Sequence, residues 1–249
     1  MTVLLTNDDG YEAEGIRALE RIFSEKHEVW VVSPSGNRSA QSHALNLREP
    51  IKMTKYGENR WHCSGTPTDC ILYSIRGGLF PHKPDLIISG INHGANCSSD
   101  ILYSGTCGAA MEGVMQGIRA IALSVERGAD GSFGFDDAAR FALDNLDKLI
   151  SLTAFDSIVN VNFPTPHSGR VIPADVGLIE YPDKPIPTVE EDGSVTFRLG
   201  GGEVEKKMYH YSAPTDVHIT NDGDIAVSVI RVLPEINREK QQEIGEIFS

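Results

Sequence analysis

The chain has 249 residues, of which 40% are hydrophobic, and its formal net charge at pH 7 is -13. This length and hydrophobic content suit one large globular α/β domain, or one domain with an appended subdomain. The acidic balance argues against a partner that is a nucleic acid polymer, because proteins bind such polymers by neutralising phosphates with a basic surface.

The N-terminus and the cysteines favour a cytoplasmic protein. The first residues lead straight into an apolar run, without the basic and long apolar segments of a signal peptide, and no apolar run approaches transmembrane length. The four cysteines show no Cys-x-x-Cys pairing, which is typical of reduced thiols and unlike a zinc site. We therefore expect a cytoplasmic location and no membrane partner.

The apolar run 3–5 ends at two adjacent carboxylates, Asp8 and Asp9. A helical pattern over 12–25 and a second apolar run over 28–33 follow, so the chain is expected to open with a βαβ unit of parallel strands. Ligands bind at the carboxyl ends of such strands, and a divalent cation is the simplest partner for two like charges. A polar turn without a site is the alternative interpretation of this stretch.

A polar loop over 34–43 should reach the same edge of the sheet if the crossover is right-handed, and it would bring Arg38 and Ser39 towards the acid pair. The loose alternation over 45–61 predicts an antiparallel hairpin outside the parallel core. A helix should begin at Thr66, where the side chain can cap it and a proline follows.

A strand over 85–88 is followed by mostly small and polar residues over 90–106, and then by a helical pattern over 107–117. Such a long loop in a compact fold is usually functional or disordered. Its end, Tyr103 to Thr106, is typical of an anion seat at a helix N-terminus. Simple capping by Ser104 and Thr106 explains that end equally well.

Further strands are predicted over 119–125 and 157–161, with a helix over 135–152 between them. The predicted fold class is thus α/β, with a Rossmann-like three-layer core of about five parallel strands over residues 1–164. Residues 165–249 would form an extension, in which we expect a β-rich arm over 180–211, a late strand over 225–233 and a terminal helix over 235–248. Such an arm commonly mediates oligomer contacts, although a decorative insertion is the alternative.

Six motifs combine these features in one order: Leu4–Gly10 (LLTNDDG), Ser33-Pro34 with Arg38-Ser39, Gly65–Cys70 (GTPTDC), Pro84–Asn96 (PDLIISGINHGAN), Tyr103–Thr106 (YSGT) and Asn160–Pro164 (NVNFP). Together they resemble the SurE family, the stationary-phase survival proteins that act as metal-dependent nucleoside monophosphate phosphatases. The sequence departs from the family pattern at Cys97–Ser98, where Leu-Gly is more usual, and at Gly223–Asp224, where Gly-Tyr is more usual.

The resemblance implies a cofactor, a substrate and a partner. It implies one divalent ion per subunit, Mg or Mn, held by Asp8, Asp9, Ser39 and Asn92. The substrate would be a nucleoside 5'-monophosphate, with 3'-monophosphates and short polyphosphate as further candidates, and its phosphate would lie on Asn96, Ser104, Gly105 and Thr106. The catalytic residues would be Asp8 and Asn96, and the partner a second copy of the chain, in a homodimer or homotetramer.

Two questions about the chemistry stay open. Asp8 could deprotonate a water molecule or attack phosphorus itself and form an aspartyl-phosphate. Aspartyl-phosphate enzymes of other families place a carboxylate two positions after the nucleophile. This chain has Gly10 at that position, which argues against an aspartyl-phosphate mechanism. A non-catalytic nucleotide-binding sensor on the same fold is the alternative from a different class of function.

Overall fold

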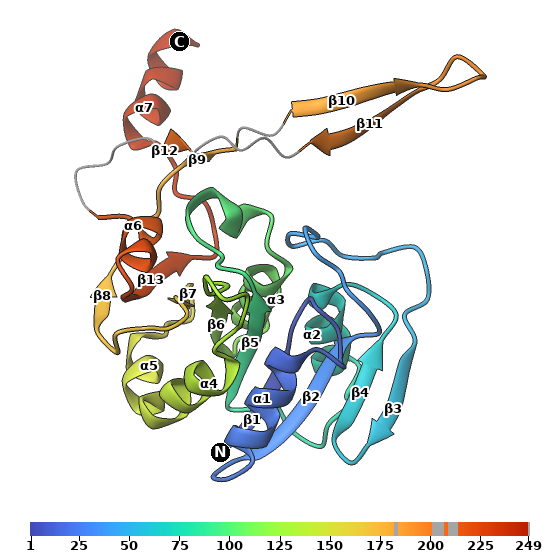
Figure 1. Ribbon diagram of the computed structural model, residues 1–249, viewed down its shortest axis with the longest axis vertical. Coiled ribbons are helices and arrows are strands. Elements are labelled where there is room, and N and C mark those ends of the chain that lie inside the picture. Colours follow the sequence, from blue (N-terminus) through green and yellow to red (C-terminus); the bar gives the residue numbers. More distant parts are fainter. Residues whose placement is uncertain (182–183, 201–206, 209–213, 249) are drawn as a thin grey trace.

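The computed structural model describes residues 1–181, 184–200, 207–208 and 214–248 (Figure 1). Its fold is α/β, as predicted, and a nine-stranded sheet with the order β3-β4-β2-β1-β5-β6-β7-β13-β8 runs through it. The centre of the sheet is parallel and consists of β1 (Thr2–Thr6), β2 (Glu28–Pro34), β5 (Leu86–His93), β6 (Arg119–Val125) and β7 (Ser157–Phe163).

Helices cover both faces of this sheet, which gives the predicted three layers (Figure 1). On one face lie α1 (Glu14–Phe23), α4 (Phe135–Asp144) and α5 (Leu146–Leu152), and on the other lie α2 (Pro67–Arg76) and α3 (Gly105–Met115). Alternate residues of each strand enter the two cores, because side chains point to opposite faces of a strand. Val3 and Leu5 thus belong to the α1 side, while Leu4 packs with Trp30 on the α2 side.

The sheet extends further than the predicted core at both edges. The hairpin of β3 (Met53–Gly57) and β4 (Arg60–Cys63) is antiparallel, as predicted, but β4 also pairs with β2 in parallel, so the hairpin continues the sheet. At the other edge, β13 (Ile225–Arg231) pairs with β7 and β8 (Val171–Pro173) pairs with β13. Residues beyond 164 therefore supply two strands of the main sheet.

Two local predictions were wrong. The stretch 90–106 is not one long loop, because β5 continues to His93, a 3-10 helix, η1, covers Ser98–Leu102, and α3 begins at Gly105. The predicted helix over 135–152 is broken at Asn145, whose side-chain amide donates to the Phe141 carbonyl at 3.0 Å. A polar side chain that bonds the preceding turn competes with the helical hydrogen-bond pattern.

The C-terminal extension carries a projecting hairpin and two helices. The hairpin consists of β10 (Lys184–Val189) and β11 (Val195–Gly200), and it stands away from the main body (Figure 1). Beside it, β9 (Ile179–Glu180) pairs with β12 (Lys207–Met208), while α6 (Asp216–Asn221), which the sequence did not predict, precedes β13. The predicted terminal helix is α7 (Arg238–Ile247). The rest of the predicted arm, at 182–183, 201–206 and 209–211, lies outside the described residues.

Across the described part of the chain, no helix has the length and apolar character needed to cross a bilayer.

Candidate metal and phosphate site

A tight turn presents Asp8 and Asp9 at the carboxyl end of β1. The Asn7 side chain donates to the Gly10 carbonyl at 2.9 Å and accepts from the Gly10 N–H at 3.2 Å. Gly10 has a φ of +106°, and a Cβ there would lie 3.1 Å from the backbone of Gly36. Glycine is needed at this position, because other residues rarely adopt that backbone conformation.

Asp8 is a buried carboxylate with an internal partner. The Thr106 hydroxyl donates to its Oδ1 at 2.6 Å. Burial is the main reason why the pKa of Asp8 is raised to about 6; the Thr106 hydrogen bond opposes the shift, and the charge of Asp9 adds to it. A buried carboxylate with a raised pKa beside a second carboxylate is a common feature of functional sites.

Asp9 is held from the other side by His93. The ring Nδ1 of His93 lies 2.9 Å from Asp9 Oδ2, and the His93 backbone N–H donates to the same oxygen at 3.3 Å. The hydrogen bond to Asp9 raises the pKa of His93, against the effect of burial. The His93 ring makes T-shaped contacts with the rings of Phe133 and Phe135, with centroid distances of 5.2 and 4.6 Å.

Backbone contacts bring the loop that carries Ser39 to the acid pair. The Arg38 N–H donates to the Asp8 carbonyl at 2.7 Å. Further along this loop, Ser42 donates to the Leu102 carbonyl at 2.6 Å, and His43 Nε2 lies 2.9 Å from the buried carboxylate of Glu112 in α3. The loop is thereby fixed to the same helix whose N-terminus faces Asp8.

The N-terminus of α3 lies directly against Asp8. Ser104 caps the helix by accepting from the Cys107 N–H at 3.0 Å. A Cβ on Gly105 would lie 2.9 Å from Asp8 Cβ and 3.0 Å from Pro67, so only glycine allows this approach. The first N–H groups of a helix have no partner within it, and they favour an anion.

Asn96 is anchored in a buried polar network below the surface of the site. Its N–H donates to Asn162 Oδ1 at 2.7 Å, and its carbonyl accepts from Asn160 and Asn162 at 2.9 and 3.2 Å. Its side-chain amide donates to the Ser124 hydroxyl at 2.8 Å. Each of these residues is nearly fully buried, so the network fixes the position of the 94–97 backbone.

The donor chemistry of the predicted ligands fits a hard divalent cation. No described residue donates a hydrogen bond to Asp9 Oδ1, Ser39 Oγ or Asn92 Oδ1, while the Asn92 amide nitrogen is used on the Gly94 carbonyl at 2.9 Å. Carboxylate, hydroxyl and amide oxygens suit Mg or Mn, and a cation would offset the burial of Asp8. Within the described ranges there is no cluster of three or more His, Cys, Asp and Glu side chains that could hold a metal ion, so the predicted ligand set depends on the Ser39 and Asn92 oxygens beside the two carboxylates.

The predicted site residues thus fall into two groups. Asp8, Asp9, Ser39 and Asn92 come from the ends of β1, β2 and β5 at one edge of the sheet. Asn96, Ser104 and Thr106 instead use their side chains internally, on Ser124, the Cys107 N–H and Asp8, and Gly105 has no side chain. Asn160, Asn162 and Ser124 were not predicted from the sequence, although the alternation of Asn160 and Asn162 in the buried strand β7 could have indicated those two.

Comparisons with known proteins agree on one family. Residues 3–177 match the model of the family described as Survival protein SurE. The chain is 44% identical over 167 residues to a 5'-nucleotidase SurE of Erythrobacter litoralis, covering 66% of each chain, and 36% identical over 239 residues to that of Allorhizobium ampelinum, covering 93% and 92%. A crystal structure of a SurE protein from Aquifex aeolicus has a TM-score of 0.83 at 30% identity and covers both chains fully.

Proposed function

The chain belongs to the SurE family, whose matched relatives are named 5'-nucleotidases, and on that premise we propose that it hydrolyses nucleoside 5'-monophosphates to nucleoside and phosphate. The observation that carries the proposal is the approach of the α3 N-terminus to Asp8 at Gly105. This approach places an anion-binding helix end beside a buried carboxylate that can take part in proton transfer.

The metal ligands of the proposed site are Asp8, Asp9, Ser39 and Asn92. A divalent ion bound there, Mg or Mn, would polarise a phosphoryl oxygen and acidify a water molecule. Thr106 keeps Asp8 oriented through its hydroxyl, and His93 does the same for Asp9. Both carboxylates are thereby held in one geometry before the substrate arrives, which is how fixed charges lower a barrier.

The phosphate is proposed to lie at the N-terminus of α3, near Ser104, Gly105 and Thr106, with Asn96 beside it. Backbone N–H groups at this helix end would stabilise the charge that develops on the phosphoryl oxygens. Asn96 contributes a backbone whose position is fixed by Asn160 and Asn162. The same phosphate-binding site can accept a 3'-monophosphate or the end of a short polyphosphate, since the site contacts only the phosphoryl group.

The experiment that tests this function is phosphate release from a panel of nucleotides with Mg or Mn, with EDTA, and in the variant Asp8→Asn. We expect release that needs the metal and is lost in the variant. Release that survives both EDTA and the substitution would contradict the mechanism. A phosphoaspartate trapped at Asp8 would identify this residue as the nucleophile, and binding of nucleotides without turnover would favour the sensor.

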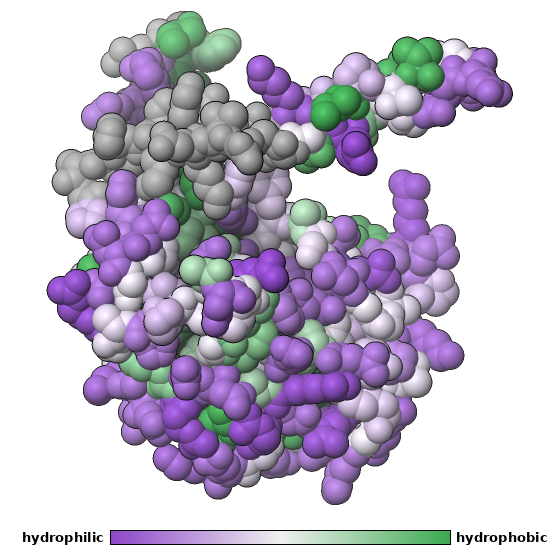
Figure 2. Space-filling view, viewed as in Figure 1, coloured by the Kyte–Doolittle hydropathy of each residue, from purple (hydrophilic) through white to green (hydrophobic). Residues whose placement is uncertain are grey.

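A homo-oligomer is the proposed state of the molecule, and the hairpin of β10 and β11 supports it. Its cross-strand pairs on one face are all apolar: Pro185 with Leu199, Pro187 with Phe197, and Val189 with Val195. Leu199, Val189 and Phe197 are about 70% exposed, and Figure 2 shows apolar side chains along the hairpin. A contiguous exposed apolar face usually marks an interface, here with a second copy in a homodimer or homotetramer.

Cytoplasmic location stays a prediction of the sequence.

A further inference from the structure

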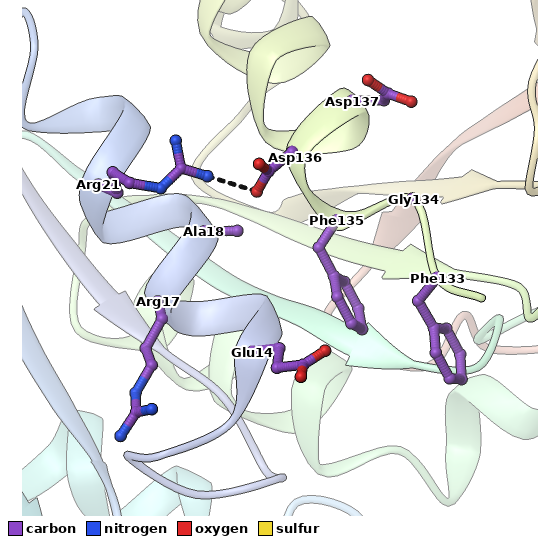
Figure 3. Close-up of a pocket in the computed structure, with 9 residues that line it drawn as sticks. All are labelled: Glu14, Arg17, Ala18, Arg21, Phe133, Gly134, Phe135, Asp136 and Asp137. Atoms are coloured by element: carbon purple, nitrogen blue, oxygen red, sulfur yellow. Dashed lines mark hydrogen bonds and ion pairs between the residues drawn. The ribbon is translucent and has the colours of Figure 1, made fainter.

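A groove lies between α1 and the segment 133–137 at the start of α4 (Figure 3). Its volume is about 580 Å³, and α1 lines it with Glu14, Arg17 and Arg21. Phe133 and Phe135 line the opposite wall, and their rings are parallel within 9° at a centroid distance of 5.2 Å. Phe135 is buried, whereas Phe133 is only partly buried and leaves an aromatic surface in the groove.

This groove borders the candidate site through one side chain. The His93 ring contacts both phenylalanines, and the same ring binds Asp9 at 2.9 Å. Glu14 begins α1, which follows the Asp8–Asp9 turn directly, so it marks the end of the groove nearest the carboxylates. The ion pair of Arg21 with Asp136 lies at the far end (Figure 3).

The charges in the groove suit a neutral ligand better than an anion. Three carboxylates, Glu14, Asp136 and Asp137, face two guanidinium groups, and Arg21 is already paired with Asp136. A phosphate would therefore find no free excess of positive charge here. A flat aromatic group can stack on a phenylalanine, and hydroxyl groups beside it can donate to a carboxylate such as Glu14.

The order of the strands links the groove to the proposed phosphate-binding site at the N-terminus of α3. Strand β1 lies between β2 and β5, with α1 packed on one face of the sheet and α3 on the other. Ligands of open α/β sheets bind in the crevice at this switch of strand order. A substrate whose phosphate lies at the α3 N-terminus can thus extend past Asp9 and His93 towards α1.

We propose that the groove between α1 and residues 133–137 binds the nucleoside part of the substrate, with the base on Phe133 and the ribose near Glu14. This inference rests on the proposed function and adds the residue that determines specificity. Because stacking grows with the area of the base, purine nucleotides should have a lower KM than pyrimidine nucleotides.

The test compares adenosine 5'-monophosphate with ribose 5-phosphate, which has the same phosphate and sugar but no base. The readout is the ratio of kcat/KM for the two substrates in wild type and in the variants Phe133→Ala, Phe133→Leu and Phe133→Tyr. We expect this ratio to fall about tenfold in the Ala and Leu variants, mainly through the KM of the nucleotide. The Tyr variant keeps the aromatic face and should keep the ratio.

Phe155→Ala is the matched control, because Phe155 is an exposed phenylalanine that packs on Arg119 away from the groove. An unchanged ratio in folded Phe133→Leu, or an equal fall in Phe155→Ala, would overturn the inference and leave the proposed function intact. If wild type cleaves neither substrate, the proposed function fails instead. In that case, equilibrium binding of adenosine to wild type and to Phe133→Ala tests the groove. The inference requires about tenfold weaker binding to the variant, and equal binding to both overturns it.

Discussion

At the scale of single residues, the site depends on how burial changes the chemistry of Asp8. Its folded-state pKa, raised to about 6, means that the folded chain holds a proton more tightly than the unfolded chain does. The contribution of this group to stability is therefore fully present at low pH and is lost as the pH rises through about 6. A bound cation at the carboxylate would replace that proton.

The first prediction follows from this competition between proton and cation. The affinity of the chain for Mn should fall between pH 7 and pH 5, by up to about tenfold per pH unit, because one proton must leave Asp8 before the ion binds. Titration calorimetry at several pH values measures the affinity. The variant Asp8→Asn, which has no proton to release, should bind weakly at every pH, and a wild-type affinity that does not depend on pH would contradict the prediction.

The second prediction concerns Thr106. Its hydroxyl stabilises the charged form of Asp8, so Thr106→Val should raise the pKa of Asp8 further and shift the loss of Mn affinity to higher pH. The two side chains have nearly the same shape, so packing is preserved. Thr106→Ser keeps the donor and should behave like wild type, and the same calorimetric series distinguishes the two variants.

At the scale of elements, the contact between the α3 N-terminus and the β1 turn decides the geometry of the site. Asp8 and Gly105 are far apart in the chain, and no local rule requires them to meet. A Cβ at Gly105 would overlap Asp8 Cβ and the Pro67 ring at once, and neither of these is a flexible chain end. The helix can approach only because this position has no side chain.

The third prediction is that Gly105→Ala will lower phosphate release by about tenfold or more, because a shift of about 1 Å in a catalytic group can cost up to about a hundredfold. The free energy of unfolding should fall by about 1–3 kcal/mol, the usual cost of overpacking. Gly36→Ala, with open space around the added Cβ, is the control for adding a methyl group nearby. Kinetics and urea unfolding of both variants make the comparison, and equal effects would show that the close contact is not the cause.

At the scale of the whole molecule, the projecting hairpin has an apolar face that a single copy of the chain does not bury. Its apolar face includes Phe197, which is 67% exposed, and its other face carries Thr188 opposite Thr196. Two-stranded hairpins are marginal on their own, since they bury little apolar surface. Contact with a second copy would supply the missing burial.

The fourth prediction is that Phe197→Asp will reduce the mass of the particle in solution, because a charge in a desolvated apolar contact is costly. Light scattering coupled to size-exclusion chromatography measures this mass. Thr196→Asp adds the same charge on the opposite face of the hairpin and should leave the mass unchanged. A wild-type chain that is already monomeric would refute the proposed oligomer.

Much of the core was predictable because local patterns determine it. Strand β6 has the predicted bounds, β1 and β2 differ by one residue at most at either end, and the apolar spacing of α1 located its buried face. The break at Asn145 and the start of α3 were missed, since single polar side chains and a glycine contact override periodicity there. The joining of β4, β8 and β13 to the sheet was missed as well, because strand pairing depends on partners elsewhere in the chain.

The sequence by itself determined the fold class, the family and the oxygen-rich residues at the ends of the strands, because periodicity is a local property and the motifs follow one another in order along the chain. Only the tertiary structure decided that Thr106 binds Asp8, 98 positions away, that His93 joins Asp9 to the Phe133–Phe135 pair, and that Asn160 and Asn162 hold Asn96. Such contacts arise when packing of the two cores brings distant strand and helix ends together, and no local pattern records which side chains will then meet.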